Sequence, residues 1–207
     1  MEPDKPVPTA KSLEWKWWRH KSIHCGQTKG FSTCSKIAMF DMDGTLIKVK
    51  SGKNNPVDAK DWLWFDPCVP LKIKEVHNNG YGIVILTNQK GISLGLVRVE
   101  ELEEKVMTFA QEIGVNLTVF MATKDDEFRK PGTGVIKYFE SLNGAFDKSA
   151  SYYVGDSAGR PAGPGRGKDY SDCDRFFAIN AGLPFYTPEE YFLNKEVTLP
   201  QLPKLEK

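Results

Sequence analysis

The chain has 207 residues, a formal net charge of +1 and 27% charged residues. This length and mixed composition indicate one globular domain and exclude a wholly disordered chain. Because the net charge is close to zero, the protein does not attract nucleic acid through its overall charge. Binding of nucleic acid therefore requires a local basic patch. The chain has no apolar run long enough to span a bilayer, and its first residues lack the apolar segment of a secretory signal. We therefore expect no membrane partner.

Residues 1–35 are expected to form a polar, proline-rich tail, followed by a tryptophan-rich segment that packs on the domain. Within this segment Trp15 and Trp17 alternate with polar neighbours, as in a β-strand. Packing against the core is favoured over an aromatic platform for stacking bases. Residues 194–207 are expected to form a C-terminal tail. None of the cysteines stands in CxxC spacing, which favours free thiols over a zinc site or a disulfide framework.

Residues 36–193 alternate between short apolar runs and amphipathic segments. The apolar runs predict β-strands at 37–40, 83–86, 117–121 and 152–154. The amphipathic segments predict helices at 71–79, 97–113 and 135–142, with further helices from 171 and after 187. Continuous apolar strands that alternate with helices are typical of a parallel sheet covered on both faces. We therefore predict a Rossmann-like, three-layer α/β/α domain with a central parallel sheet, whose ligands bind beyond the carboxyl ends of the strands.

The first of these strands is followed by the sequence Asp41-Met42-Asp43-Gly44-Thr45. An Asp-Gly pair is common in turns, so a turn without further function is the simplest interpretation. Two carboxylates at one strand end also repel each other unless a cation or a shared proton lies between them. Such a pair suits Mg²⁺, which prefers oxygen ligands, and it suits a carboxylate nucleophile beside a general acid.

The other predicted strands lead into polar residues of complementary chemistry. Thr87-Asn88 offers a hydroxyl and backbone amides for phosphate oxygens, and Lys130 offers a cation that neutralises a phosphoryl group. Asp156 adds a carboxylate that can complete a metal site. Each feature alone is also typical of an ordinary polar loop. Together they place a nucleophile, a hydroxyl, a cation and a metal ligand along one edge of one sheet.

This set of motifs resembles the haloacid dehalogenase superfamily of phosphotransferases, and within it the polynucleotide 3′-phosphatase branch. The resemblance covers roughly residues 35–193. Its longest stretch begins with residues 154–161, continues through residues 165–175, and ends with residues 188–193. The shorter matches are Ser51-Gly52-Lys53, Asp61-Trp62, Thr87-Asn88-Gln89 with Gly91-Ile92, and Arg129-Lys130-Pro131-Gly132.

The resemblance implies roles for the residues at the strand ends. Asp41 attacks a terminal 3′-phosphate and forms an aspartyl-phosphate, while Asp43 protonates the leaving 3′-oxygen and then activates water. Mg²⁺ is held by Asp41, the backbone carbonyl of Asp43 and Asp156. The phosphoryl oxygens are bound by Thr87, Asn88 and Lys130. The implied function is removal of 3′-phosphate from DNA strand-break ends during repair in the nucleus, by a protein that we expect to be a monomer.

The resemblance also implies a narrow cleft that admits a single strand. The candidate contacts to the nucleic-acid backbone are Arg129, Arg160, Arg166 and Lys168, and structural ion pairs are the alternative for each. After Gly91-Ile92 the family commonly carries basic residues where this chain has Ser93-Leu94-Gly95-Leu96, a departure that bears on substrate preference.

Two missing features narrow these expectations. An ATP-binding loop of kinases has a leading glycine and ends in Gly-Lys followed by Ser or Thr. Around Gly167-Lys168 the leading glycine is replaced by Ala162, and the Ser or Thr is replaced by Asp169. We therefore expect no kinase activity. Segments 46–86 and 88–129 are short and largely filled by core elements, which leaves no room for a large cap domain and favours a macromolecular substrate.

Two alternatives stay open. A small-molecule phosphatase of the same superfamily acts on sugar or histidinol phosphates, and some such relatives carry a clustered-cysteine zinc loop that is absent here. The second alternative is a non-catalytic module that binds DNA ends. Loss of Asp41 or Asp43 would favour such a module, but both residues are present.

Overall fold

The computed structural model describes residues 12–32, 34–53 and 55–202. Its main feature is a seven-stranded sheet with the strand order β1-β2-β7-β6-β3-β8-β9. Neighbours from β7 to β9 are parallel, whereas β2 pairs antiparallel with both β1 and β7. The strands are β1 (Trp15–His20), β2 (Ile23–Thr28), β3 (Lys36–Phe40), β6 (Tyr81–Asn88), β7 (Leu117–Ala122), β8 (Tyr152–Val154) and β9 (Phe185–Tyr186).

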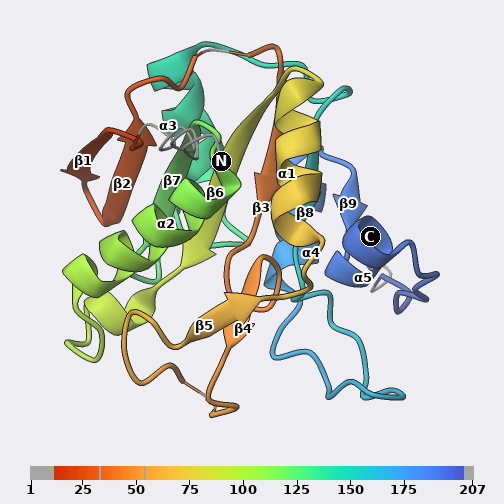
Figure 1. Ribbon diagram of the computed structural model, residues 1–207. Coiled ribbons are helices and arrows are strands. Elements are labelled where there is room, and N and C mark those ends of the chain that lie inside the picture. The colour runs from red at the N-terminus through yellow and green to blue at the C-terminus, as the bar shows by residue number, and fades with distance from the viewer. Residues whose placement is uncertain (1–11, 33, 54, 203–207) are drawn as a thin grey trace, which may run out of the picture.

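Helices cover both faces of this sheet (Figure 1). One face packs against α1 (Val69–Asn78), α2 (Val99–Ile113) and the short α5 (Pro188–Leu193). The other face packs against α3 (Gly134–Asn143) and α4 (Cys173–Ala181). The three predicted layers are therefore present, and the central sheet is mostly parallel. No helix in the described part of the chain is both long and apolar enough to cross a membrane.

The buried strands are apolar along their whole length because each face of the sheet has its own core. In β3, Ala38 and Phe40 face the core beneath α1 and α2, whereas Ile37 and Met39 face the core beneath α3 and α4. This alternation follows from the two-residue repeat of a strand. The predicted helix at 97–113 begins two residues later, at Val99, and Gly114 ends it in the left-handed conformation with φ of 73°.

The N-terminal tryptophans belong to a β-hairpin that extends the sheet. β1 was predicted, but β2 was not, because Ile-His-Cys-Gly-Gln-Thr has little apolar alternation. The hairpin is held by packing across its strands: Trp17 stacks on Trp15 and on His24, and its ring lies over Gly26. Most of the predicted tail, residues 1–11, lies outside the described residues, and the domain bounds 1–35, 36–193 and 194–207 stay a prediction.

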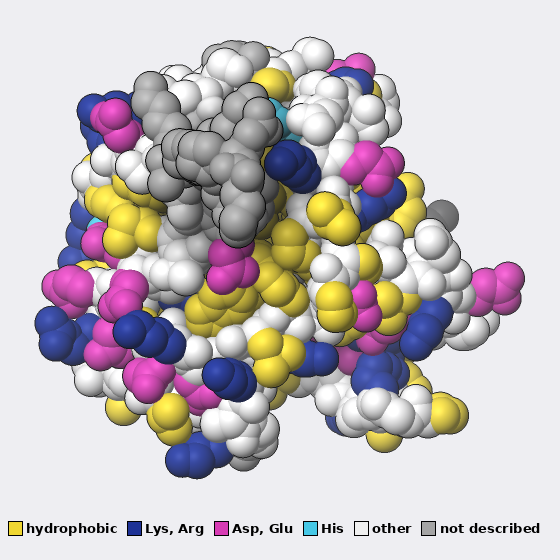
Figure 2. All heavy atoms as spheres, viewed as in Figure 1, with side chains coloured by type: hydrophobic (Ala, Val, Ile, Leu, Met, Phe, Trp, Pro, Cys, Tyr) yellow, Lys and Arg dark blue, Asp and Glu magenta, His cyan; other side chains and the backbone are white. Residues whose placement is uncertain are grey.

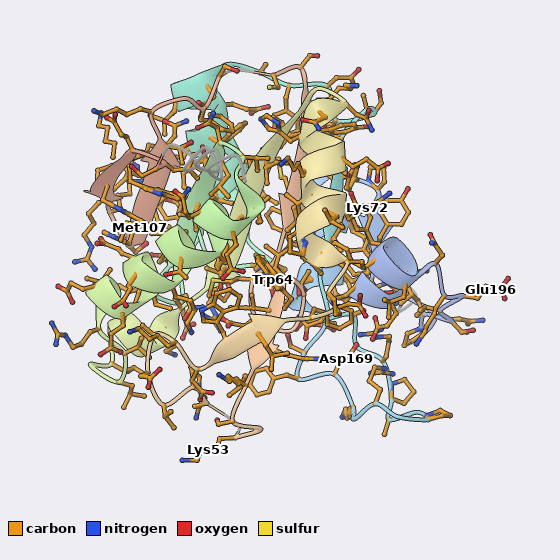
Figure 3. All side chains as sticks on the ribbon, in the orientation of Figure 1. Lys53, Trp64, Lys72, Met107, Asp169 and Glu196 are labelled. Atoms are coloured by element: carbon orange, nitrogen blue, oxygen red, sulfur yellow. The ribbon has the colours of Figure 1, made fainter. Side chains whose placement is uncertain are left out.

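A second hairpin stands at the carboxyl edge of the sheet. It consists of β4 (Ile47–Val49) and β5 (Trp62–Trp64), and it begins directly after the Asp41–Thr45 segment. The buried carboxylate of Asp61 anchors its long loop by accepting hydrogen bonds from the backbone and hydroxyl of Ser51 and from the backbone of Val57. Lys53 lies at the tip of this loop (Figure 3). Within the described residues the segment from 46 to 86 holds only this hairpin, α1 and β6, as predicted for a protein without a large cap.

We predict that Gly26→Ala destabilises the protein, although alanine suits a strand better than glycine. A methyl group at Gly26 would lie 2.3 Å from the nearest ring atom of Trp17, so the stacked ring must move. The expected loss is about 1–3 kcal/mol in the free energy of unfolding, measured by urea denaturation. Gly167→Ala is the control, because no atom lies within 4 Å of a methyl group there. Equal stability of the two variants would contradict this description of the hairpin.

Candidate active site

The predicted site residues meet at the carboxyl edge of the parallel strands. Asp41 directly follows β3, Thr87 and Asn88 end β6, and Asp156 stands two residues after β8. Figure 1 shows the β4–β5 hairpin and the loop at 157–172 projecting from this same edge. The side chains of Asp41 and Thr87 are buried, whereas Asp156 is partly exposed.

A buried lysine lies at the centre of the site. The Lys130 ammonium is within 2.6 Å of Asp41 Oδ1 and 2.8 Å of Asp174 Oδ1. It also lies 2.6 Å from the Tyr153 hydroxyl and 2.8 Å from the Leu86 carbonyl oxygen. Burial alone lowers the pKa of Lys130, but the carboxylates of Asp174 and Asp41 outweigh that effect and raise it above its usual value. Lys130 is therefore a permanent positive charge beside Asp41.

Three carboxyl groups converge around this lysine. One carboxylate oxygen from each of Asp41, Asp156 and Asp174 lies within 4.8 Å of the others. Burial raises the pKa of Asp156 to about 7, and the negative charge of Asp174 adds to the shift. Burial also raises the pKa of Asp41, an effect that Lys130 opposes. Oxygen ligands crowded at this spacing fit a hard divalent cation, which would stabilise their ionised forms.

Two glycines make this convergence possible. A methyl group at Gly44 would lie 2.6 Å from a carboxylate oxygen of Asp156, and Gly44 has a φ of +82° that other residues rarely adopt. A methyl group at Gly155 would lie 2.5 Å from the side chain of Asp174. The glycines of the Asp-x-Asp-Gly and Gly-Asp motifs therefore leave the space that lets the carboxylates approach each other.

Asp174 was not predicted as a site residue. It lies in the first turn of α4, where an acidic residue is also expected simply because it stabilises the positive end of the helix dipole. Its carboxylate nevertheless points inward and accepts hydrogen bonds from Tyr153 and from the backbone of Ser157. Helical periodicity alone does not separate this buried acid from an ordinary capping acid.

Two predicted phosphate-binding residues differ in what they contact. Thr87 is buried at the end of β6, and its hydroxyl accepts a hydrogen bond from the side-chain amide of Gln89. The Asn88 side chain instead holds the backbone of Lys130: its Oδ1 accepts from the Lys130 N–H and its Nδ2 donates to the Lys130 carbonyl. Asn88 thus fixes the position of the central lysine, and its contact with phosphate stays a prediction.

Asp43 is the exposed member of the acid pair. Its Oδ2 accepts a hydrogen bond of 2.7 Å from Gln89 Nε2, and its carboxylate is not part of the cluster of three acids. The predicted metal ligands Asp41 and Asp156 lie close together, and the third carboxylate of the cluster comes from Asp174 rather than from Asp43. An exposed carboxyl beside a buried one suits a group that exchanges protons with a ligand or with water.

The candidate nucleic-acid contacts fall into two groups. Arg160 is buried and bonded to Asp169, to Glu189 and to the carbonyl of Asp156, so it ties the loop at 157–172 to the acidic site. The other three keep exposed surface: Arg129 pairs with Asp125, Arg166 pairs with Asp169, and Lys168 has no ion pair with the described residues. Direct contact with nucleic acid stays a prediction for all four, and the geometry favours a positioning role for Arg160.

Asp169 organises the basic loop that carries three of these candidates. Its carboxylate accepts hydrogen bonds from the backbones of Ala158 and Arg160 and from the side chains of Arg160 and Arg166. Figure 3 shows it where the loop joins the body of the protein rather than at the tip of the loop. The family-like stretch from 154 to 175 is therefore a folded arm whose position relative to Asp156 is fixed by hydrogen bonds.

The comparison with known proteins agrees with these motifs. A family model described as Polynucleotide kinase 3 phosphatase matches residues 36–192. The bifunctional polynucleotide phosphatase/kinase of Schizosaccharomyces pombe is 34% identical over 191 residues, which cover 92% of this chain and 45% of that protein. The polynucleotide 3′-phosphatase ZDP of Arabidopsis thaliana is 36% identical over 182 residues, which cover 79% of this chain and 25% of that protein. The chain thus spans less than half the length of either relative.

The fold is shared with a solved phosphatase. The D,D-heptose 1,7-bisphosphate phosphatase of B. bronchiseptica, whose crystal structure contains magnesium and phosphate, superposes with a TM-score of 0.58 at 20% identity. The match covers 80% of this chain and 89% of that one. This likeness confirms the predicted haloacid dehalogenase-like fold. The family whose model matches is a family of phosphatases, which are phosphoric monoester hydrolases. This is the class of enzyme that the motifs predict.

We predict that Lys130→Met destabilises the metal-free protein, and more strongly at high pH. The substitution leaves Asp41 and Asp174 without their buried cation, which costs about 3–5 kcal/mol when the carboxyls are ionised. The raised pKa values of Asp41 and Asp156 mean that these groups hold their protons to higher pH in the folded than in the unfolded protein. The contribution of Asp156 to stability is therefore present at low pH and is lost as the pH rises through about 7, and the contribution of Asp41 is likewise lost as the pH rises through its own raised pKa.

The measurement is guanidinium denaturation in EDTA at pH 5 and pH 8, with Lys74→Met on the exposed face of α1 as the control. We expect a smaller loss at pH 5 than at pH 8 for Lys130→Met and a change below about 0.5 kcal/mol for the control. An equal loss of unfolding free energy at both pH values would show that Lys130 does not stabilise the protein by neutralising the carboxylates.

Proposed function

Because the chain belongs to the polynucleotide kinase 3 phosphatase family, we propose that it is a Mg²⁺-dependent phosphatase that removes 3′-phosphate from DNA ends. The observation that carries this proposal is the position of Asp41. Its Oδ1 is held by Lys130, while no described residue donates a hydrogen bond to its Oδ2. That second oxygen is therefore available as a nucleophile at the carboxyl edge of the sheet, the usual place for ligands in this fold.

The reaction proceeds in two steps. In the first, Asp41 Oδ2 attacks phosphorus and forms a P–O bond, while the bond to the 3′-oxygen breaks and its electron pair stays on that oxygen. The Asp43 carboxyl transfers its proton to this oxygen, which leaves as the 3′-hydroxyl. In the second step Asp43 accepts a proton from water, and the water oxygen attacks phosphorus. The acyl-phosphate bond then breaks, which regenerates Asp41 and releases phosphate.

The other groups of the site stabilise the transferring phosphoryl group. Lys130 supplies a fixed positive charge beside Asp41. The Thr87 hydroxyl, which accepts a hydrogen bond from Gln89, donates its own hydrogen to a phosphoryl oxygen. Asp41, Asp156 and Asp174, together with the predicted Asp43 carbonyl, would hold Mg²⁺, which would supply further positive charge to stabilise the phosphoryl oxygens. Three crowded carboxylates with only one lysine between them support this assignment of a divalent cation.

The proposed substrate is the 3′-phosphorylated end of a DNA strand. We propose that the protein acts on such ends as a monomer, during DNA repair in the nucleus. Among the described residues, the β4–β5 hairpin and the loop at 157–172 stand beside the site without forming a large cap, an arrangement that admits the end of a polymer. The exposed Lys168 and the partly exposed Arg129 and Arg166, which also pair with aspartates, are the candidates to contact the backbone phosphates of the strand. Figure 2 shows acidic and basic side chains interspersed over α2. We propose that Arg129, Arg166 and Lys168 supply the local positive charge that the near-neutral net charge requires.

We expect Asp41→Asn to reduce release of 3′-phosphate from an oligonucleotide to below about 0.1% of the wild-type rate. An amide cannot attack phosphorus as a carboxylate does, yet it has nearly the same shape and can still accept a bond from Lys130. The assay compares a 3′-phosphorylated oligonucleotide with a 5′-phosphorylated one and with a sugar phosphate. Circular dichroism checks that the variant is folded. Retained turnover by the variant would refute the nucleophile, and equal wild-type rates on all three substrates would leave only a general phosphatase.

Binding of Mg²⁺ should stabilise the protein more at pH 8 than at pH 6. The proton on Asp156, whose pKa is raised to about 7, competes with the cation at pH 6 and is absent at pH 8. Thermal denaturation with and without Mg²⁺ at the two pH values measures the effect as a difference in Tm. Asp174→Asn should remove most of the Mg²⁺-dependent rise in Tm. An equal rise at both pH values would contradict a metal site that includes Asp156.

A further inference from the structure

Gln89 connects two functional groups of the site, although neither the motifs nor the proposed mechanism gives it a role. Its side-chain nitrogen Nε2 lies 2.7 Å from Asp43 Oδ2 and 2.8 Å from Thr87 Oγ1. Asp43 stands on the side of the leaving group in the proposed reaction, and Thr87 on the side of the phosphoryl oxygens. One amide group therefore spans the proton donor and the phosphate-binding hydroxyl.

The backbone of Gln89 is fixed on both sides of the residue. Its N–H donates to the Ala122 carbonyl at the end of β7 with a distance of 2.7 Å. Its own carbonyl accepts from Ile92, which closes the short 3₁₀ helix η1 (Lys90–Ile92). The side chain thus projects from a fixed corner between β6 and η1 and hydrogen-bonds to both Asp43 and Thr87.

The chemistry of an amide determines what these two contacts mean. The nitrogen carries two N–H groups and no acceptor, so both Asp43 Oδ2 and Thr87 Oγ1 must accept. Because Oδ2 of Asp43 accepts a hydrogen bond from Gln89, a proton on this carboxyl is carried by Oδ1. Because Oγ1 of Thr87 accepts as well, the hydrogen of its own hydroxyl is available to a phosphoryl oxygen.

We infer that Gln89 is the positioning residue that turns Asp43 Oδ1 toward the leaving 3′-oxygen and aligns the Thr87 hydroxyl with the phosphoryl group. This inference rests on the proposed function. In the first step the proton passes from Asp43 Oδ1 to the 3′-oxygen as its bond to phosphorus breaks. In the second step the same Oδ1 takes a proton from the attacking water. Gln89 keeps its bond to Oδ2 in both steps, so one oxygen serves as acid and then as base.

The test compares two oligonucleotides that differ in one bridging atom. One ends in a 3′-phosphate, and the other carries sulfur in place of the 3′-oxygen. A thiol with a pKa near 8.5 leaves as a thiolate without receiving a proton, whereas an alkoxide needs one. Loss of a correctly positioned acid therefore slows cleavage of the oxygen ester and spares the sulfur ester. A general structural defect slows both to the same extent.

We expect Gln89→Met, which keeps the length of the side chain and removes both donors, to lower kcat/KM about 100-fold on the oxygen ester. On the sulfur ester the loss should be at most about 5-fold, the part that reflects alignment of Thr87. Asp43→Asn should show the same pattern. Gln89→Glu, which also removes both donors, is the second variant. Gln27→Met makes the same chemical change on β2, where Gln27 bonds to Asn143, and should change neither rate.

The outcomes separate this inference from the proposed function. Equal losses on the two esters, or no loss on the oxygen ester, would overturn the assignment of Gln89. Failure of the wild-type protein to cleave the oxygen ester at all would instead overturn the proposed function, and the inference with it. Thermal denaturation of each variant shows whether a loss comes from unfolding, in which case Gln89→Glu decides the question.

Discussion

The whole site depends on the balance of charge around one buried lysine. Three carboxyl groups, from Asp41, Asp156 and Asp174, lie within 4.8 Å of one another, and Lys130 contacts two of them. With all three ionised, the lysine leaves two negative charges uncompensated in a mostly buried space. The raised pKa of Asp156, at about 7, reflects that excess through burial and the neighbouring Asp174. A divalent cation held by these carboxylates would supply the missing charge, which is why we propose a metal site here.

The fold provides this crowding by bringing three strands to one edge. Parallel β3, β6 and β8 end side by side, and each delivers its polar residues at the same level. Gly44 and Gly155 leave the space in which the carboxylates meet, since a methyl group at either position would collide with one of them. Behind them Arg160 and Asp169 fix the loop at 157–172. The residues that perform chemistry are therefore held by neighbours that perform none.

The sequence predicted the parts of this structure whose physical signals are local. The apolar runs of β3, β6, β7 and β8 and the helices between them were confirmed, because burial on both faces of a parallel sheet leaves a clear pattern. β2 was missed because its sequence shows little apolar alternation and because it pairs with β7, which is far away in sequence. Asp174 was missed because an acid in the first turn of a helix is common without function. Whether a basic residue such as Arg160 is buried likewise depends on partners, Asp169 and Glu189, that no local pattern identifies.

The central claim is that the carboxylate of Asp41 forms a covalent bond to the phosphate taken from a 3′ end. The most direct test is to mix the protein with an oligonucleotide that carries a radiolabelled 3′-phosphate, stop the reaction in acid within milliseconds, and locate the label on the protein by peptide mapping. We expect label on Asp41, no label with Asp41→Asn, and no label when the radioactive phosphate is at the 5′ end. Label on another residue, or rapid release of phosphate without any labelled protein in the wild type, would contradict the account.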